Sequence, residues 1–349
     1  MNSAILPTPS SAAGFSAPFV RVVADYVQAQ GHDPAPILAL LGLSPLPSAD
    51  ERLRVPSLKL NQALHRAAQL LGDEHVGLHV ASLVRPAHLG SLGYAIMSCT
   101  RGGDGLALFE QMQSLLCTEL QGHYEIRGSH VHARHEALGT LPDDYLFWSF
   151  FIASRLSFAR WVSGRHLVPA LIELPCAAPA QVQPLLDFIG GPVQFHAKCC
   201  RELMPADWLG LLNPNADPPI HDLMTGMAKR QLQAHVEDVQ AQQAQLTQAI
   251  LRALDRGESP TLELIAAELS TPARPLQRRL AAQGLNFKRM VEDARRERAL
   301  LQLRLSNLPL PQIAAQAGYA ETSSFHRAVR RWTGMTPLQV RAANKTTLK

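Results

Sequence analysis

The chain carries two short segments in which arginine side chains are expected to lie on one face of a helix. In the second segment, "TSSFHRAVRRWT", a turn of 100° per residue places Phe325, Val329 and Trp332 on one side. The opposite side then presents Ser323, Arg327 and Arg330. A guanidinium in such a position can donate two hydrogen bonds to a guanine edge, which is the chemistry of reading the DNA major groove.

The first segment, "ARPLQRRLAAQG", repeats this arrangement around another apolar pair. Leu276 and Leu280 are spaced as neighbours on the inner face of a helix. The residues that point outward are Arg274, Arg278 and, less squarely, Gln277. Glutamine can pair with an adenine edge as arginine does with guanine. The alternative is that both polar faces are the solvated sides of an amphipathic bundle, although two matched repeats favour the nucleic-acid interpretation.

Each basic helix follows a short apolar helix and a tight turn, so that residues 261–284 and 312–334 share one layout. In the second unit Gly318 stands at the corner, where the sharp reversal requires a backbone conformation that glycine tolerates best. Between the two units, residues 286–305 predict one continuous helix of about 30 Å. That length is close to the roughly 34 Å between successive major-groove faces of a duplex. Two helix-turn-helix units on a rigid spacer are therefore predicted.

The charge distribution agrees with a nucleic-acid partner at this end of the chain. Residues 250–349 hold 17 Lys and Arg against 8 Asp and Glu, whereas the net charge of the whole chain is only +4. A basic region behind a mildly acidic body is expected when one end of a protein meets a polyanion.

Length and composition predict two domains and no membrane span. A chain of 349 residues exceeds what one core usually holds, and no apolar run approaches the roughly 18 residues of a spanning helix. The first residues lack the pattern of a secretory signal, and the five scattered cysteines indicate reduced thiols. We expect a cytoplasmic protein without a cofactor or a metal.

The residues before the basic region predict a mixed α+β domain. Residues 19–120 are mainly helical in pattern, with glycines at the expected helix ends, and "HYEIRGSHVHARHEA" predicts a β-hairpin. "DDYLFWSFFIASRLSFARWVSG" predicts a buried helix, and "ALIELP" and "PVQFHA" predict short strands. The expected organisation is a disordered tail over 1–14, an α+β domain over 15–212, a linker and linker helix over 213–245, and an all-helical domain over 246–349.

The last hundred residues resemble the DNA-binding domain of AraC/XylS-type transcription regulators. The likeness is densest in "QIAAQAGYAETSSFHRAVRRWTGMTPLQVR" and continues in "LQRRLAAQGLNFKRMVEDARRERA". The resemblance implies groove contacts from Arg274, Gln277 and Arg278 in the first unit and from Thr322, Ser323, His326 and Arg327 in the second. One departure is Pro272, which stands where the family usually has a serine that opens the first recognition helix.

Residues 19–212 resemble the longer N-terminal domain of one branch of this family, in "ILALLGL", "LLGDEHVGLHVA" and "HLGSLGYAIMSC". The domain is called arabinose-binding, but in this branch it is thought to sense varied small molecules. The resemblance implies an effector-controlled regulator of transcription, more often an activator, with double-stranded DNA, a small molecule and RNA polymerase as partners. The residues that would bind the effector are not predicted.

Alternatives remain beside this interpretation. The basic domain could dock on nucleic acid without sequence preference while the first domain binds a protein. His123, His130, His132 and His135 cluster around the hairpin and could share a metal ion, although ordinary histidines are favoured. No catalytic motif stands out, so an enzyme is not expected. A near-heptad pattern predicts either a dimeric coiled coil or a linker helix packed on its own domain: Leu232, Val236, Val239, Leu246 and Ile250.

Overall fold

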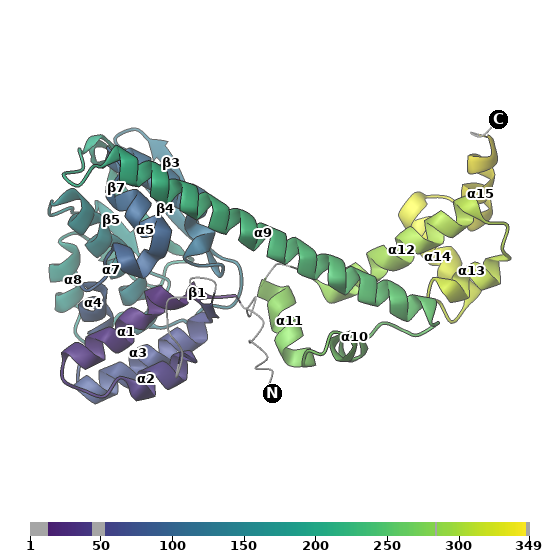
Figure 1. Cartoon of the computed structure of the whole chain (residues 1–349), viewed down its shortest axis with the longest axis horizontal. Coiled ribbons are helices and arrows are strands. Elements are labelled where there is room, and N and C mark those ends of the chain that lie inside the picture. The colour runs from purple at the N-terminus through teal and green to yellow at the C-terminus, as the bar shows by residue number, and fades with distance from the viewer. Residues whose placement is uncertain (1–12, 44–52, 283–284, 347–349) are drawn as a thin grey trace, which may run out of the picture. The chain divides into compact units, whose positions relative to one another are not determined.

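The computed structural model describes residues 13–43, 53–282 and 285–346. The chain divides into two compact units, Met1–Val236 and Glu237–Lys349, and the division falls inside one long helix, α9, Pro218–Asp255 (Figure 1). The predicted domain boundaries at 212 and 245 stay predictions. Asn213, the first residue of the predicted linker, is buried against the first unit, and its side chain donates to the carbonyls of Met97 and Cys99 at 2.6 and 2.8 Å.

The first unit begins with helices that end where the glycines indicated. Gly42 and Gly72 directly follow α2 and α3 and adopt positive φ angles of 75° and 63°. The helical elements before the main sheet are α1 Ala17–Ala29, α2 Ala35–Leu41, α3 Ser57–Leu71, α4 Val76–Ala81, η1 Pro86–Leu89, α5 Gly90–Met97, α6 Gly102–Met112 and η2 Gln113–Leu115. A two-stranded sheet pairs β1, Phe15–Ser16, with β2, Arg54–Val55.

A five-stranded sheet forms the other side of this unit, in the order β3-β4-β7-β5-β6. The predicted hairpin is confirmed as an antiparallel pair whose register joins Leu120 to Ala137 and Arg127 to His130. The strands are β3 Leu120–Arg127, β4 His130–Ala137, β5 Leu171–Glu173, β6 Val193–Gln194 and β7 Cys200–Pro205. The sequence did not predict β7, which pairs with both β4 and β5 at the centre of the sheet.

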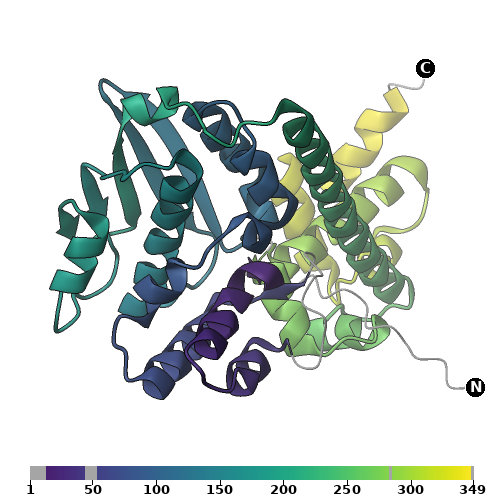
Figure 2. The same ribbon diagram turned by 60° about the vertical axis from the view of Figure 1, so that its left-hand side comes forward.

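Helix α7, Tyr145–Ser163, is the central element of the first unit. It packs against α3, α4 and α8, Gln183–Ile189, and twelve of its 19 residues are buried. Figures 1 and 2 show α1, α2 and α3 on one side of the unit and the sheet on the other. The short helix η3, Ala206–Gly210, follows β7. This arrangement confirms the predicted mixed α+β class.

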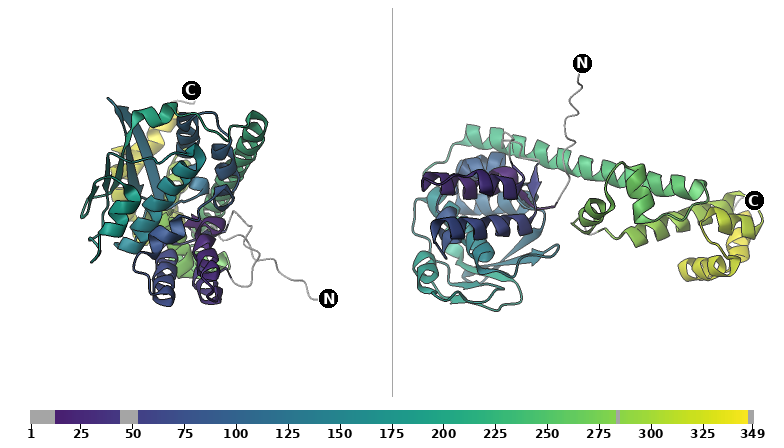
Figure 3. Two further views of the ribbon diagram at one scale, coloured as in Figure 1. Left: turned by 90° about the vertical axis from the view of Figure 1, so that its left-hand side faces the viewer. Right: turned by 90° about the horizontal axis from the view of Figure 1, so that it is seen from below.

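The second unit is all helical and contains the two predicted helix-turn-helix pairs. The first pair is α10, Leu262–Glu268, and α11, Ala273–Ala282; the second is α13, Leu310–Gln316, and α14, Thr322–Thr333. The spacer helix α12, Phe287–Leu305, joins the two pairs. The last described helix is α15, Pro337–Thr346 (Figure 3).

Each helix pair has its own apolar core, and α12 contributes to both. Val291 and Ala294 pack with Leu246, Ile250 and the first pair, while Ala299 and Leu303 pack with the second pair around Phe325. Leu246 and Ile250 are thus buried within the second unit, which favours the interpretation of the near-heptad pattern as helix packing. Val236 is 40% exposed, and the side chain of Val239 lies outside the described residues.

No helix among the described residues is long and apolar enough to cross a membrane. The cysteines are free, and four of the five are buried. Burial raises the pKa of Cys117 and of Cys176 to about 12, so these thiols stay protonated near neutral pH and are poor nucleophiles.

We predict that Phe325→Ala selectively unfolds the second helix pair. The ring is fully buried and lies 5.8 Å from that of Tyr319, so truncation removes the centre of a small core at a cost of about 3–5 kcal/mol. Hydrogen exchange measured by mass spectrometry should show faster exchange over residues 310–333. The neighbouring variant His326→Ala, which changes a half-buried side chain, should exchange like the parent. Unchanged protection in Phe325→Ala would mean that this ring does not hold the pair together.

Candidate nucleic-acid interface and interior cavity

The second basic helix, α14, has the two faces that its sequence predicted. Phe325, Ala328 and Val329 are buried against α12 and α13. The outer face carries Ser323, Arg327 and Arg330, all exposed, with Thr322 and His326 half-buried beside them. Among the described residues, neither Arg327 nor Arg330 forms an ion pair. These guanidinium groups are therefore available to an anionic or hydrogen-bonding partner.

Short-range hydrogen bonds order the start of this helix. The Ser323 hydroxyl donates to Glu321 Oε2 at 3.1 Å, and Arg327 Nη2 donates to the Ser324 hydroxyl at 3.1 Å. Both contacts are exposed, so a ligand can replace them at little cost.

The C-terminal end of α14 is bound to the spacer helix α12 by the carboxylate of Glu292. Glu292 on α12 accepts a hydrogen bond from the Trp332 indole at 3.0 Å and forms an ion pair with Arg331. Arg331 is therefore engaged within the fold, unlike Arg327 and Arg330. The corner residue Gly318 has a φ angle of 77°, and a Cβ there would lie 2.6 Å from Leu254 Cδ2. Glycine at this corner thus permits both the turn and the close packing on α9.

The first basic helix, α11, shows the same division into two faces. Leu276 and Leu280 are buried, whereas Arg274 and Gln277 are exposed. The side chain of Arg278 lies outside the described residues. At the corner of this first helix pair, Ser270 takes the place that Gly318 has in the second pair. Its φ angle is 51°. Ion pairs from Arg252 and Arg256 to Glu268 hold α10 against the end of α9.

A second site lies inside the first unit, where the sequence predicted no site residues. A cavity of about 210 Å³ is lined mainly by α6, α7, η3 and the inner face of the sheet. Its walls are mainly aromatic and aliphatic, with Phe109, Leu120, Phe151, Phe158, Met204 and Trp208 among them. Cavities of this kind, largely apolar with a few convergent polar groups, are the usual form of small-molecule sites.

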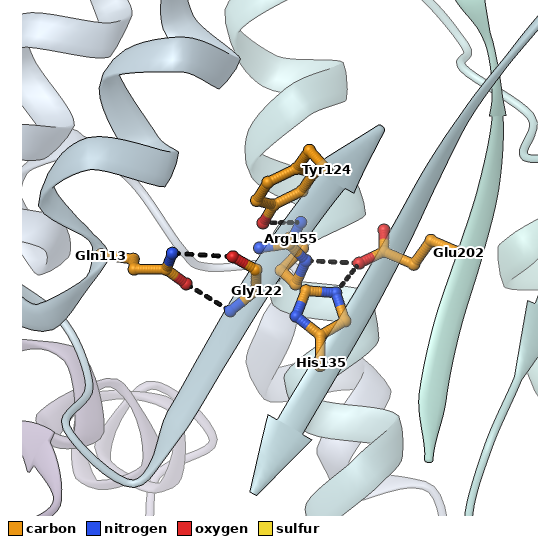
Figure 4. Close-up of polar contacts among 6 residues, drawn as sticks. All are labelled: Gln113, Gly122, Tyr124, His135, Arg155 and Glu202. Atoms are coloured by element: carbon orange, nitrogen blue, oxygen red, sulfur yellow. Dashed lines mark hydrogen bonds and ion pairs between the residues drawn. The ribbon is translucent and has the colours of Figure 1, made fainter. Parts of the chain in front are cut away.

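The polar groups converge on Arg155, which α7 directs toward the sheet (Figure 4). Its Nε donates to Glu202 Oε1 at 2.6 Å, and its Nη2 donates to the Tyr124 hydroxyl at 3.0 Å. His135 Nε2 lies 2.7 Å from the same Glu202 oxygen. The guanidinium also lies near three aromatic rings, with centroid distances of 5.0 Å to Phe109, 5.7 Å to Phe151 and 5.8 Å to Tyr124.

The electrostatics of this cluster leave one positive and one negative charge inside the fold. Burial alone would raise the pKa of Glu202, but the charge of Arg155 and the hydrogen bond from His135 lower this pKa to about 2. Burial alone would lower the pKa of Arg155, yet Glu202 raises it above its ordinary value. Burial and the adjacent Arg155 charge lower the pKa of His135, so the imidazole is neutral and its Nε2–H donates to Glu202.

Helix α6 and η2 fix strand β3 at the edge of the cavity. The Gln113 side chain accepts from the Gly122 amide at 2.6 Å and donates to the Gly122 carbonyl at 2.9 Å (Figure 4). A Cβ on Gly122 would lie 2.8 Å from the Tyr124 hydroxyl and 3.1 Å from His135 Nδ1. Glycine at this position therefore keeps open the space in front of both side chains.

Sequence reasoning did not predict the polar residues of the cavity wall or Tyr124, which joins them through its hydrogen bond from Arg155. The polar residues of the wall are Gln113, His135, Ser154, Arg155, Ser163, Glu202 and Asn213. The available signal was a single arginine within the apolar stretch "LFWSFFIASRLSF", because a charge in a buried helix requires a buried partner. His135 is buried and faces inward, whereas His132 is exposed on the other face of β4. No group of three metal-ligating side chains comes together among the described residues.

Comparison with known proteins accounts for both units. Residues 31–212 match the family model described as the arabinose-binding domain of the AraC transcription regulator, N-terminal part, and residues 265–343 match a helix-turn-helix domain. Two basic helix-turn-helix units combined with such a domain define a DNA-binding transcription regulator. The chain belongs to the AraC family of these regulators, as the resemblance of its sequence implied.

Similar proteins from bacteria are named as transcriptional or metabolic regulators. The chain is 27% identical over 294 residues to the ornithine utilization regulator of Pseudomonas aeruginosa, which covers 83% of this chain and 85% of that protein. It is 27% identical to an uncharacterised HTH-type transcriptional regulator of Mycobacterium tuberculosis over 91% of this chain and 93% of the relative. The HTH-type transcriptional regulator VirS of M. tuberculosis is 49% identical over 80 residues, which cover 23% of this chain and 24% of VirS.

The buried ion pair predicts an acid-sensitive first unit. The folded pKa of Glu202 is about 2 and its ordinary value is 4.5, so its stabilisation is complete above pH 4.5 and is lost as the pH falls toward 2. Between pH 6 and pH 3 we expect the parent to lose about 2 kcal/mol more stability than Glu202→Gln. Hydrogen exchange of the first unit at the two pH values measures this difference. Glu173→Gln, which removes a carboxylate from the exposed pair with Arg201, should lose as much as the parent; an equal loss in Glu202→Gln would contradict the prediction.

Proposed function

We propose that α11 and α14 are the recognition helices of this regulator and that they read base edges in the major groove. The residues assigned to DNA contact are Arg274, Gln277, Arg278, Thr322, Ser323, His326, Arg327 and Arg330. The observation that carries the proposal is the outer face of α14, opposite a buried apolar face. There the guanidinium groups of Arg327 and Arg330 have no ion-pair partner within the part of the chain that the structure describes.

We propose further that the cavity in the first unit is the effector site. It lies within the domain that matches the arabinose-binding model, and it combines apolar walls with a buried polar cluster around Arg155 and Glu202. A ligand there shifts the regulator between two states only by binding one of them more tightly. The name of the domain does not assign arabinose to this cavity.

The resemblance to the family supports activation of transcription rather than repression, through contact with RNA polymerase. This role implies a cytoplasmic protein, and no enzymatic activity is proposed because the family consists of regulators. Transcription in vitro from a promoter bound by the protein, with and without it, tests the direction: a rise in transcript supports activation, and a fall indicates repression.

We propose that the protein forms a homodimer through the first part of α9. Ile220, Leu223 and Met227 follow one another at helical spacing and are 39%, 58% and 38% exposed. An apolar stripe of this kind on a helix is suited to pairing with its own copy, because a two-fold contact brings equal stripes together.

A footprint tests the proposed function directly. It is made on the DNA upstream of the gene that encodes this protein and upstream of the neighbouring genes, over a salt series with competitor DNA. Protection of two patches about one helical turn apart that survives competitor supports two recognition helices. Diffuse protection that disappears at modest salt would leave only nonspecific docking.

Arg327→Ala should weaken binding to the protected site by about 1–3 kcal/mol and relax the preference at one base position. A titration against the site and its single-base variants measures both effects. The matched control is Arg289→Ala, which removes one positive charge from the exposed surface of α12 and should weaken binding to all sequences equally. An unchanged base preference in Arg327→Ala would refute the assignment of this residue.

Leu223→Glu should convert the protein to a monomer, because two carboxylates would face each other in the proposed contact. Sedimentation equilibrium of the parent and the variant measures the change in mass. Leu301→Glu, which alters an exposed leucine of the second unit, is the control and should leave the mass of the parent unchanged. A monomeric parent, or a dimeric Leu223→Glu, would exclude this interface.

A further inference from the structure

We propose that the cavity binds an uncharged, mainly apolar molecule whose single polar head, a carboxamide or a group with the same hydrogen bonds, sits on the Arg155–Glu202 pair. This inference rests on the proposal that the cavity is the effector site, and it names the chemical class of the effector.

The walls select an apolar body. Of the residues that surround the cavity, those from α7 follow one helical stripe, and Phe151, Phe158 and Val162 present rings and methyl groups to it. Leu120 and Met204 close it from the sheet, and Trp208 closes it from η3. A polar or multiply hydroxylated body would lose its hydration here without recovering it, at a cost for each unpaired group.

The charges of the polar end disfavour an ionic head. Arg155 and Glu202 neutralise each other, and the neutral His135 adds no charge. A carboxylate bound at Arg155 would come close to the Glu202 carboxylate, and an ammonium bound at Glu202 would come close to the guanidinium. Because the side chains of Arg155 and Glu202 are only 16% and 8% exposed, either ligand would carry an uncompensated charge into the interior.

The remaining hydrogen-bonding capacity of the pair is one donor group and one acceptor, which lie on opposite sides of the pair (Figure 4). Arg155 Nη1 and Glu202 Oε2 have no hydrogen-bond partner among the described residues, since the pair uses Nε, Nη2 and Oε1. A carboxamide can use either group without bringing a charge, because its carbonyl can accept from Nη1 and its N–H can donate to Oε2.

The volume of the cavity limits the size of the ligand. A cavity of about 210 Å³ accommodates roughly 10–15 non-hydrogen atoms.

The test compares three probes of equal chain length on the full-length protein: octanamide, octanoate and octylamine, which are neutral, anionic and cationic at pH 7. Isothermal titration calorimetry should give a dissociation constant for octanamide at least tenfold below those of the two ions. Equal or tighter binding of either ion, or no binding of octanamide, would overturn the proposed class.

Two variants locate the binding. Val162→Phe, which adds a ring to the apolar wall of the cavity, should weaken octanamide binding severalfold. Glu202→Gln removes the negative charge beside Arg155, so the preference should invert toward octanoate; a merely structural role of Glu202 would weaken all three probes alike and would overturn the assignment. Glu173→Gln should keep the parent's preference, because its carboxylate lies in the exposed pair with Arg201. Val162→Phe leaves the polar pair unchanged and remains decisive if Glu202→Gln does not fold.

A footprint with and without octanamide separates this inference from the function on which it rests. Octanamide binding that alters the footprint supports both. Octanamide binding that leaves the footprint unchanged supports the ligand class but removes the cavity as the effector site. A ligand-sensitive footprint produced only by octanoate or octylamine would retain the effector site and overturn the class.

Discussion

The first unit depends on one buried positive charge. Arg155 projects from an apolar helix into the interior, and an unpaired guanidinium there would be strongly destabilising. Its pairing with Glu202 brings β7 to the helix, and its bond to the Tyr124 hydroxyl brings β3. His135, from the strand between them, adds a second hydrogen bond to the same oxygen of the carboxylate. The pairing of this one charge thus ties α7 to two strands of the sheet, and it leaves a polar end in an otherwise apolar cavity.

The second unit is organised by a helix that belongs to two cores. The first half of α12 packs with α10 and α11, and the second half packs with α13 and α14. Because the core of each pair includes part of α12, the distance between the two basic helices within this unit is set by a single rigid element. Glu292 joins α12 to α14 through Trp332 and Arg331. The outer face of α14 is therefore positioned by contacts that other residues of the same helix make with α12.

The candidate DNA interface was predictable because a helix imposes its own periodicity. The spacing of Phe325, Val329 and Trp332 is enough to assign Arg327 and Arg330 to the opposite side, and no distant residue changes that result. The cavity was not predictable in the same way. Glu202 lies in a strand that short-range patterns did not reveal, and its contact with Arg155 joins residues 47 positions apart. His135 resembled its neighbours in the hairpin, and only the strand register placed it inward.

By itself, the sequence determined the class of each unit, the two helix-turn-helix pairs, their basic faces and the family, because these follow from local periodicity, composition and a long motif. Only the tertiary structure decided where the interior of the first unit is open and which polar groups face that space. It also decided that Arg331 is engaged by Glu292 while Arg327 is not, although both stand on one short helix. The physical reason is that burial and pairing of a side chain depend on elements distant in the chain, which a local pattern does not specify.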